Sequence, residues 1–307
     1  PRLCRDWSSD VCSSDLIDEL NDINDNPEDL IFDKFEEVLY KGKSLAQPII
    51  GREEVIKNFS RQQLIEFHEN KIKFNQPLIV ASGNIDHDFL CSLAEKYFKK
   101  NLNPLHVREN LILNNSSTEL IVDKEIQQVY CIVGKASYGY NDERRIPLNL
   151  LSNIIGDGSS SRIFQQIREK HGIAYQINSF VNSYYDTSVF GIYFSTSEKQ
   201  LDKVLRLIST EFKKLIDTNV SKKELMRVKE YIKGSITLGL ENTTNRMIRA
   251  ANSYLYFGRV ISIDEIISQI DIVNEEQIQQ ISSELFDEKN MTKVIIKSNS
   301  KLIKKAA

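Results

Sequence analysis

The side chains best suited to metal chemistry are scarce in this sequence of 307 residues. It contains four histidines, which are His68, His87, His106 and His171. No two of them stand three or four residues apart, so no helix can present a pair of histidines to one metal ion. We therefore expect each histidine to be a solvated or helix-capping residue.

A second candidate for chemistry is the segment GDGSSSR at residues 156–162. Its serines could act as nucleophiles, but the G-x-S-x-G pattern that presents a nucleophilic serine on a sharp turn is absent. Its glycines could enclose a phosphate, but the lysine and the preceding strand of a P-loop are also absent. The pattern is typical of a turn followed by the N-cap of a helix. These residues alone predict an α+β protein without an assignable activity.

Composition and charge exclude several classes of protein. Hydrophobic residues make up 41% of the chain and charged residues 27%, which is typical of a folded protein with a buried core. Forty basic and 43 acidic side chains give a formal net charge of −3, so the basic excess of a nucleic-acid-binding protein is missing. No apolar run approaches the roughly 20 residues that span a bilayer. We therefore expect no nucleic-acid partner and no membrane span.

Residues 1–16, PRLCRDWSSDVCSSDL, differ in composition from the rest of the chain. They contain the single tryptophan and two of the four cysteines, and they lack both an amphipathic period and a signal-peptide pattern. The stretch resembles a translated sequencing adapter, so we expect it to be an artefact; the alternative is a genuine disordered tail. The remaining cysteines, Cys91 and Cys131, are expected to be buried, and their scarcity favours a reducing compartment such as the cytoplasm.

The apolar periodicity predicts a mixture of helices and strands. Helices are expected at 28–40, 60–73, 86–99, 142–155, 197–216 and 221–241, with one more up to Lys170 and shorter ones to about 286. Strands are expected at 78–81, 119–124, 127–135, 174–184, 188–195 and 291–297. Strand pairs followed by runs of helices favour an α+β fold with a mostly antiparallel sheet. A polar stretch at 101–117 is typical of an interdomain linker.

Two segments of the chain share a pattern that suggests two similar domains. Residues 60–80 and 274–296 each begin with a helix cap, continue as a helix, break at an asparagine and end in an apolar strand. The breaks lie around Asn75 and Asn290.

Residues 156–179, GDGSSSRIFQQIREKHGIAYQINS, closely resemble the G-x-G-x-S-S-R-L-F-Q-x-I-R-x-x-x-G-L-A-Y signature of the pitrilysin/insulinase (inverzincin) zinc peptidases. The match is best to the bacterial, processing-peptidase-like branch of that family. Residues 75–86 and 258–278 also resemble segments of the family, and the resemblance extends from Ile17 to about Lys297.

The resemblance implies an α+β fold with two homologous domains, each a mostly antiparallel sheet with helices packed on it. We expect the first domain to be incomplete at its N-terminus and to occupy residues 17–105. A linker at 106–117 and a second domain at 118–307 would follow.

For the metal, the resemblance implies a zinc site of which this chain lacks the main part. In the family, an H-x-x-E-H helix supplies two histidine ligands and a general-base glutamate, and a later helix supplies a glutamate ligand. Glu19 aligns with that later glutamate, whereas the H-x-x-E-H helix is absent and Cys12 takes the place of an accompanying glutamate. The alternative is that Glu19 is one more solvated acid. A single carboxylate cannot hold catalytic zinc, so we expect the chain as given to be inactive.

The substrate contacts that the second domain makes in active relatives are better preserved. Arg168 and Tyr175 match the arginine and tyrosine of the R-x-x-x-G-[LI]-x-Y stretch. The resemblance implies that Arg168 binds peptide carbonyls and that Tyr175 donates its hydroxyl near the scissile carbonyl, which a zinc-bound hydroxide attacks. The alternative is an exposed arginine at a helix end and a core tyrosine.

Two functions of different classes follow from the resemblance. The first is a zinc-dependent endopeptidase of processing-peptidase type, which hydrolyses extended peptides or unfolded polypeptides and forms a homodimer or pairs with a related subunit. The second is a noncatalytic subunit that binds peptides or stabilises an active partner. The presence of Glu19, Arg168 and Tyr175 favours the first.

Overall fold

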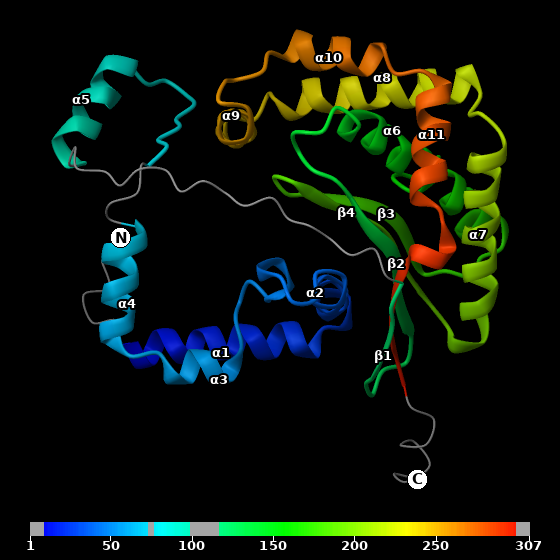
Figure 1. Ribbon diagram of the computed structural model, residues 1–307, viewed down its shortest axis with the longest axis horizontal. Helices are drawn as coiled ribbons and strands as arrows, with labels where there is room; N and C mark the ends of the chain where they lie inside the picture. The colour runs from blue at the N-terminus through cyan, green and yellow to red at the C-terminus, as the bar shows by residue number, and fades with distance from the viewer. Residues whose placement is uncertain (1–8, 73–76, 99–116, 299–307) are drawn as a thin grey trace. The chain divides into compact units, whose positions relative to one another are not determined.

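The computed structural model describes residues 9–72, 77–98 and 117–298 (Figure 1). By its internal contacts the chain divides into two compact units, each assembled from separate stretches of sequence. Unit 1 takes the described residues of Pro1–Asp22, Ile49–Asn110 and Ser235–Ile261. Unit 2 takes those of Ile23–Pro48, Leu111–Gly234 and Ser262–Ala307.

Unit 2 is built around a sheet that contains, within the described residues, five strands in the order β1-β5-β2-β4-β3. They are β1 (Glu119–Asp123), β2 (Val129–Tyr138), β3 (Gln176–Ser183), β4 (Thr187–Thr196) and β5 (Thr292–Lys297). β1 pairs with β5 in parallel, and the other neighbouring strands pair antiparallel. This mostly antiparallel sheet with its helices confirms the expected α+β class. Every residue of β4 is buried, because helices cover both faces of the sheet.

One face of the sheet is covered by α2 (Pro27–Leu39), as Figure 1 shows. The helix starts at Asn26, whose side chain accepts a hydrogen bond from the Glu28 N–H, with Pro27 in the first turn. Its buried residues Leu30, Ile31 and Phe35 form one hydrophobic cluster with alternate residues of three strands. These strand residues are Ile132, Val189, Tyr193, Val294 and Ile296. A helix from the N-terminal part of the chain thus completes the core of unit 2.

An aromatic contact under α2 accounts for a glycine in the sheet. Phe32 of α2 packs edge-on against Phe180 of β3, with ring centroids 5.0 Å apart. Phe180 in turn covers Gly191 of β4, where a Cβ atom would stand 2.5 Å from the ring. A larger residue at Gly191 would displace this ring from its packed position.

The opposite face is covered by α6 (Arg145–Ile155), α7 (Leu201–Asp217) and α11 (Glu275–Leu285). Phe212 of α7 stacks on Phe286, which directly follows α11, with ring centroids 4.0 Å apart. Phe286 also lies 5.7 Å from the ring of Phe190 on β4. These three rings fasten both helices to the sheet.

The remaining elements are helices and short turns. Unit 1 contains α3 (Glu53–Asn58), α4 (Arg61–Phe67), the π-helix η2 (His68–Ile72), α5 (His87–Tyr97) and α9 (Thr243–Phe257). Unit 2 also contains α10 (Ile263–Asp271), the π-helix η3 (Phe164–Lys170), and the 3-10 turns η1 (Ser44–Ala46), η4 (Glu198–Gln200) and η5 (Glu288–Asn290). α1 (Ser9–Asp25) and α8 (Lys222–Gly239) have residues in both units. Among the described residues, every helix is too short or too polar to cross a bilayer.

Most of the expected helices and strands are confirmed, but the strand expected at Leu78–Ala81 is wrong. Residues 77–82 have no regular secondary structure. The reason is that a strand needs a neighbour for its hydrogen bonds, and the described part of unit 1 contains no strand. The segment that ends at Lys170 is helical as expected, but it winds as a π-helix over most of its length.

The two remaining cysteines differ in their surroundings. Cys131 of β2 is fully buried as expected, and this burial raises the pKa of its thiol. Cys91 is exposed, so its expected burial is wrong. It lies on α5, which buries none of its residues.

Some expectations concern residues outside the described ones. The linker expected at 106–117 lies outside them except for Ser117, and so does His106. Of the N-terminal stretch 1–16, residues 9–16 are described, and they belong to α1.

Candidate functional site

The loop at residues 156–162, where the signature begins, is shaped by two glycines. Gly156 lies against β3, where a Cβ atom would stand 2.6 Å from the backbone nitrogen of Ser179. Gly158 has a φ of +92°, which side chains other than glycine rarely adopt. The turn closes with a hydrogen bond from Ser161 Oγ to the Gly158 carbonyl, at 2.7 Å. The expected turn is confirmed, whereas the expected serine cap is not seen, because no side-chain hydrogen bond caps the start of η3, the helical segment that follows the loop.

Two buried serines connect the base of this loop to β3. The hydroxyls of Ser152 on α6 and Ser179 on β3 are 2.8 Å apart, and Ser179 Oγ lies 2.7 Å from the Ser152 carbonyl. The Ser179 N–H donates to the Gly156 carbonyl at 3.2 Å. These bonds satisfy polar groups that would otherwise be costly to bury. Helix α6, the loop and β3 therefore form one hydrogen-bonded base.

Arg168 and Tyr175 stand at the two ends of the turn that follows this base. Arg168 is in η3, and Tyr175 directly precedes β3. Between them, Gly172 has a φ of +60° and its N–H donates to the Arg168 carbonyl at 3.1 Å. The Tyr175 N–H donates to the carbonyl of Ser195 on β4 at 2.9 Å. The backbone at both positions is thus fixed by hydrogen bonds.

The side chains of these two residues face solvent. Arg168 is exposed, and its guanidinium carbon lies 5.1 Å from the centroid of the Phe164 ring. Tyr175 is 55% exposed, so the alternative interpretation of a core tyrosine is wrong. In the described part of the chain no carboxylate pairs with Arg168. Both side chains are therefore available to a ligand.

Glu19, the expected metal ligand, is exposed on α1 and belongs to unit 1, whereas Arg168 and Tyr175 belong to unit 2. Across the described residues, no three side chains of histidine, cysteine, aspartate or glutamate gather in a way that could hold a metal ion. The histidines His68, His87 and His171 are exposed, in agreement with their expected solvation.

One pair of potential metal ligands was not found from the sequence. His87 and Cys91 stand one helical turn apart on α5, with Nε2 and Sγ separated by 3.5 Å. A histidine and a cysteine four residues apart share one face of a helix in the same way as two histidines do. Two ligands fall short of the three or four that a zinc site uses.

A cavity of about 520 Å³ lies beside the signature loop in unit 2. Its lining comes from the loop, η3, α7 and the start of α8, and consists of Ser160, Ser161, Arg162, Gln165, Gln166, Glu211, Lys214, Ser221, Lys223, Glu224 and Arg227. Arg162 makes a bidentate pair with Glu224, with Nε–Oε1 at 2.9 Å and Nη2–Oε2 at 2.7 Å. These hydrogen bonds raise the pKa of Arg162 and join the loop to α8.

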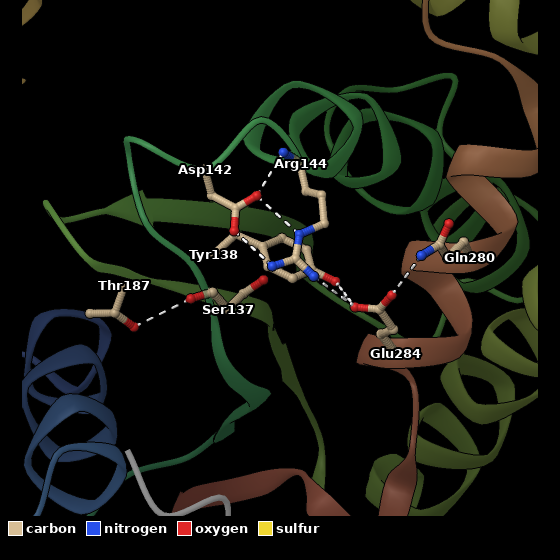
Figure 2. A network of polar contacts seen from close by, with 7 residues as sticks. All are labelled: Ser137, Tyr138, Asp142, Arg144, Thr187, Gln280 and Glu284. Atoms are coloured by element: carbon tan, nitrogen blue, oxygen red, sulfur yellow. Dashed lines mark hydrogen bonds and ion pairs between the residues drawn. The ribbon is translucent and has the colours of Figure 1, made fainter. Parts of the chain in front are cut away.

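Figure 2 shows a polar network that joins β2 and the start of α6 to α11. The Tyr138 hydroxyl donates to Glu284 Oε2 at 2.5 Å, which lowers the pKa of Glu284. The Arg144 guanidinium lies 4.0 Å above the Tyr138 ring and pairs with Asp142 at 2.7 Å, which lowers the pKa of Asp142. Gln280 donates to the other Glu284 oxygen at 3.1 Å. The bonds from Tyr138, Arg144 and Gln280 to Glu284 fasten α11 to the sheet and to the start of α6.

Comparison with protein families decides the identity of the chain. The family model described as the peptidase M16 inactive domain matches residues 58–232, which is more than half of the chain. The chain belongs to the peptidase M16 family. This membership confirms the resemblance on which the expected peptidase fold was based, and the signature at 156–179 lies inside the matched range.

Several proteins similar to this chain are named zinc proteases. An uncharacterized zinc protease of Rickettsia felis is 30% identical over 275 residues, which cover 88% of this chain and 66% of that protein. The uncharacterized zinc protease YmxG of Bacillus subtilis is 30% identical over 278 residues, which cover 89% of this chain and 66% of that protein. The chain thus spans about two thirds of the length of these relatives.

Solved structures of low sequence identity share the fold. A chain of complex III from Candida albicans has a TM-score of 0.83 at 19% identity, covering 92% of this chain and 70% of its own. The peptidase M16 inactive domain from Pseudomonas fluorescens has a TM-score of 0.81 at 16% identity, covering 97% of this chain and 72% of its own. A protease from Helicobacter pylori has a TM-score of 0.79 at 18% identity, covering 93% of this chain and 70% of its own.

The names of these relatives imply a zinc site. The residues described in this chain do not form such a site. Glu19 is exposed, and no group of three potential ligands exists among the described residues. Tetrahedral zinc sites take at least three protein ligands. The described residues therefore cannot hold a catalytic zinc ion by themselves.

Proposed function

We propose that this chain is the peptide-contacting part of a zinc-dependent endopeptidase of processing-peptidase type. The proposal depends on one observation, the exposure of Arg168 and Tyr175 at the two ends of a hydrogen-bonded turn. Side chains on a backbone that is already ordered bind a ligand without the entropic cost of ordering a loop. The M16 membership and the names of the relatives support a peptide as the ligand.

Arg168 and Tyr175 would contact the main chain of an extended peptide. The planar guanidinium of Arg168 can donate parallel hydrogen bonds to carbonyl oxygens. The Tyr175 hydroxyl can donate to the carbonyl oxygen of the bond to be cleaved, where negative charge develops during hydrolysis. Every peptide offers these carbonyls, so the contacts would give affinity with loose sequence preference.

The proposal includes the expected organisation of the chain. The peptidase domains would lie at 17–105 and at 118–307, with a linker at 106–117 and an artefact at 1–16. Glu19 would be a zinc ligand of the proposed endopeptidase. Because the described residues supply no further ligand set, the 307-residue chain would bind peptides without hydrolysing them.

A second candidate function is a noncatalytic subunit of the same family. The description of the matching family model as an inactive domain favours it, as does the missing ligand set among the described residues. The fold neighbour from complex III comes from a multi-subunit assembly, which supports pairing with a related subunit. A homodimer is the other arrangement that we propose for either function.

Peptide binding to the purified 307-residue chain tests the contact residues. We expect an unfolded, fluorescently labelled casein fragment to bind. Arg168→Ala should weaken binding roughly tenfold or more and Tyr175→Phe roughly threefold, because they remove charged and neutral hydrogen bonds respectively.

Matched controls are available on the same unit. Arg206 on α7 is exposed, and Tyr231 on α8 is 57% exposed, close to the value for Tyr175. Arg206→Ala and Tyr231→Phe should leave the affinity unchanged. If the controls weaken binding as much as the test variants, or if the peptide does not bind, the proposal is wrong.

Hydrolysis provides a separate test. Incubation of the chain with casein and added Zn²⁺ should leave the casein intact. Cleavage that is lost on chelation and restored by zinc would contradict the proposed inactivity of this chain and the noncatalytic alternative together.

A further inference from the structure

The cavity beside the signature loop carries an excess of positive charge. It measures about 520 Å³ and lies entirely within unit 2. Among the described residues that line it, the cations are Arg162, Lys214, Lys223 and Arg227, and the carboxylates are Glu211 and Glu224. The cations therefore outnumber the carboxylates by two.

Two of these cations are already neutralised by the carboxylates. Arg162 is paired in bidentate fashion with Glu224, and Lys214 Nζ lies 2.6 Å from Glu211 Oε1. Both carboxylates have little exposed side chain, 19% for Glu224 and 6% for Glu211, so they belong to the wall of the cavity. The excess charge resides on the other two cations.

Lys223 and Arg227 stand one helical turn apart on α8, and both are exposed. Arg227 Nη2 donates to the Ser160 carbonyl at 3.2 Å, which holds the guanidinium beside the loop. Over the described ranges, neither residue forms an ion pair with a carboxylate. Like charges at this spacing destabilise a helix unless an anion lies between them.

We propose that this cavity binds a small molecule through an oxyanion group of two or more negative charges, held between Lys223 and Arg227. The guanidinium can offer two parallel donors to such a group, and the ammonium can add a third. Ser221 Oγ accepts a hydrogen bond from the Glu224 N–H at 3.2 Å, so its own proton remains to be donated into the cavity.

The size of the cavity indicates the class of ligand. Sites for small molecules commonly measure about 300–1,000 Å³, so this one has room for more than the oxyanion itself. The ligand is an organic molecule that carries a phosphate, a pyrophosphate or several carboxylates. Arg168 and Tyr175 do not line the cavity, so this site does not depend on the proposed peptide contacts.

Calorimetric titration of the 307-residue chain tests the site. The probes are inorganic phosphate, pyrophosphate and citrate, each at the same ionic strength set with sodium chloride. We expect saturable binding of pyrophosphate or citrate. Tighter binding of pyrophosphate would indicate a phosphate-bearing ligand, and tighter binding of citrate would indicate a polycarboxylate.

Two charge-removing variants locate the binding, and two others serve as controls. Arg227→Gln and Lys223→Gln should each weaken the best probe by roughly tenfold or more, because each removes charge-assisted hydrogen bonds. Lys222→Gln removes the same charge from the neighbouring position on α8, which is exposed and does not line the cavity, and it should change the affinity less than twofold. Arg168→Ala should have no effect.

Two results would overturn the proposal. The first is that none of the three probes binds saturably at millimolar concentration. The second is that Lys222→Gln and Lys223→Gln weaken probe binding equally, because that would indicate general electrostatic attraction to α8. If Arg227→Gln does not fold, Lys223→Gln still decides the outcome, because the Lys223 side chain is exposed and forms no hydrogen bond or ion pair with the described residues.

Discussion

Residues 60–80 and 274–296 have similar sequence patterns, and their described parts have different structures. Both segments begin with a complete capping box, made by Ser60 and Gln63 in α4 and by Asn274 and Gln277 in α11. The helices differ in what they bury. α11 packs on the sheet with Ile278 fully buried, whereas α4 buries no residue. A capping signal therefore starts a helix in either setting, and it does not determine whether the helix has a partner.

The ends of the two segments differ even more. In the later segment, β5 pairs with β1 on one side and with β2 on the other. In the earlier segment, residues 77–82 form no strand. A cap therefore depends on four consecutive residues, whereas a strand and a buried helix face depend on residues far away in the sequence.

The largest difference should appear when a matching apolar residue is shortened in each helix. Ile278→Ala should lower the free energy of unfolding by about 2–5 kcal/mol, because the residue is fully buried and a cavity would remain. Leu64→Ala should lower it by less than about 1 kcal/mol, because Leu64 is 50% exposed. Urea unfolding followed by circular dichroism measures both. Equal losses would mean that α4 is as well packed as α11.

Removal of the caps should have a smaller effect that is similar in size for the two helices. Asn274→Ala and Ser60→Ala each remove the acceptor for a backbone N–H, at 2.9 Å from Gln277 and 3.3 Å from Gln63. Each loss should cost about 1 kcal/mol. For α11, urea unfolding of the sheet should show the lower free energy of unfolding. For α4, the loss should appear as faster amide hydrogen exchange in α4 alone.

The conservative variant Asn274→Ser provides the control, because serine also accepts a hydrogen bond from the N–H of the third helical residue. It should retain most of the stability that Asn274→Ala loses. A global loss of stability with Ser60→Ala would contradict the idea that α4 folds as a local element.

The smallest effect should come from the acidic network that fastens α11. The main cause that lowers the pKa of Glu284 is the hydrogen bond from the Tyr138 hydroxyl. The hydrogen bond from Arg144 lowers the pKa of Asp142. Groups with a lowered pKa stabilise the folded state above their ordinary pKa values, 4.5 and 3.8 here, and this contribution is lost as the pH falls through the folded pKa.

Glu284→Gln should therefore cost about 0.5 kcal/mol at pH 7, a modest value because the carboxylate is 39% exposed. The difference from the unmodified chain should shrink as the pH falls below 4.5. Tyr138→Phe should reduce the same pH dependence, since it removes the donor. A difference that is constant from pH 7 to pH 3, measured by urea unfolding, would contradict the role of the ionised carboxylate.

These comparisons also indicate how much of the fold could be predicted from the sequence. The helices and strands of unit 2 follow from apolar periodicity, because the residues that set each pattern are adjacent in sequence. The loop at 156–162 was correctly interpreted as a turn for the same reason. The strand expected at Leu78–Ala81 and the burial expected for Cys91 were wrong, because both depend on neighbours that the described part of unit 1 does not provide.

The candidate site could be predicted only in part. Arg168 and Tyr175 were found from the signature, and their exposure became known only from the structure. The pair of Arg162 and Glu224 joins residues 62 positions apart, and the bond from Tyr138 to Glu284 joins residues 146 positions apart. No local pattern encodes such contacts, because they arise where α8 meets the loop at 156–162 and where α11 meets β2.

The position of α2 on the sheet has a consequence for cutting the chain. Its buried residues hold it against Ile132, Val189 and Val294, and in the sequence the connection from α2 to β1 runs over residues 40–118. A protease that nicks this connection would yield two bands on a denaturing gel, yet the fragments would elute together in native buffer. A recombinant fragment that begins at residue 118 would expose the apolar sheet face and require α2 as a separate peptide for solubility.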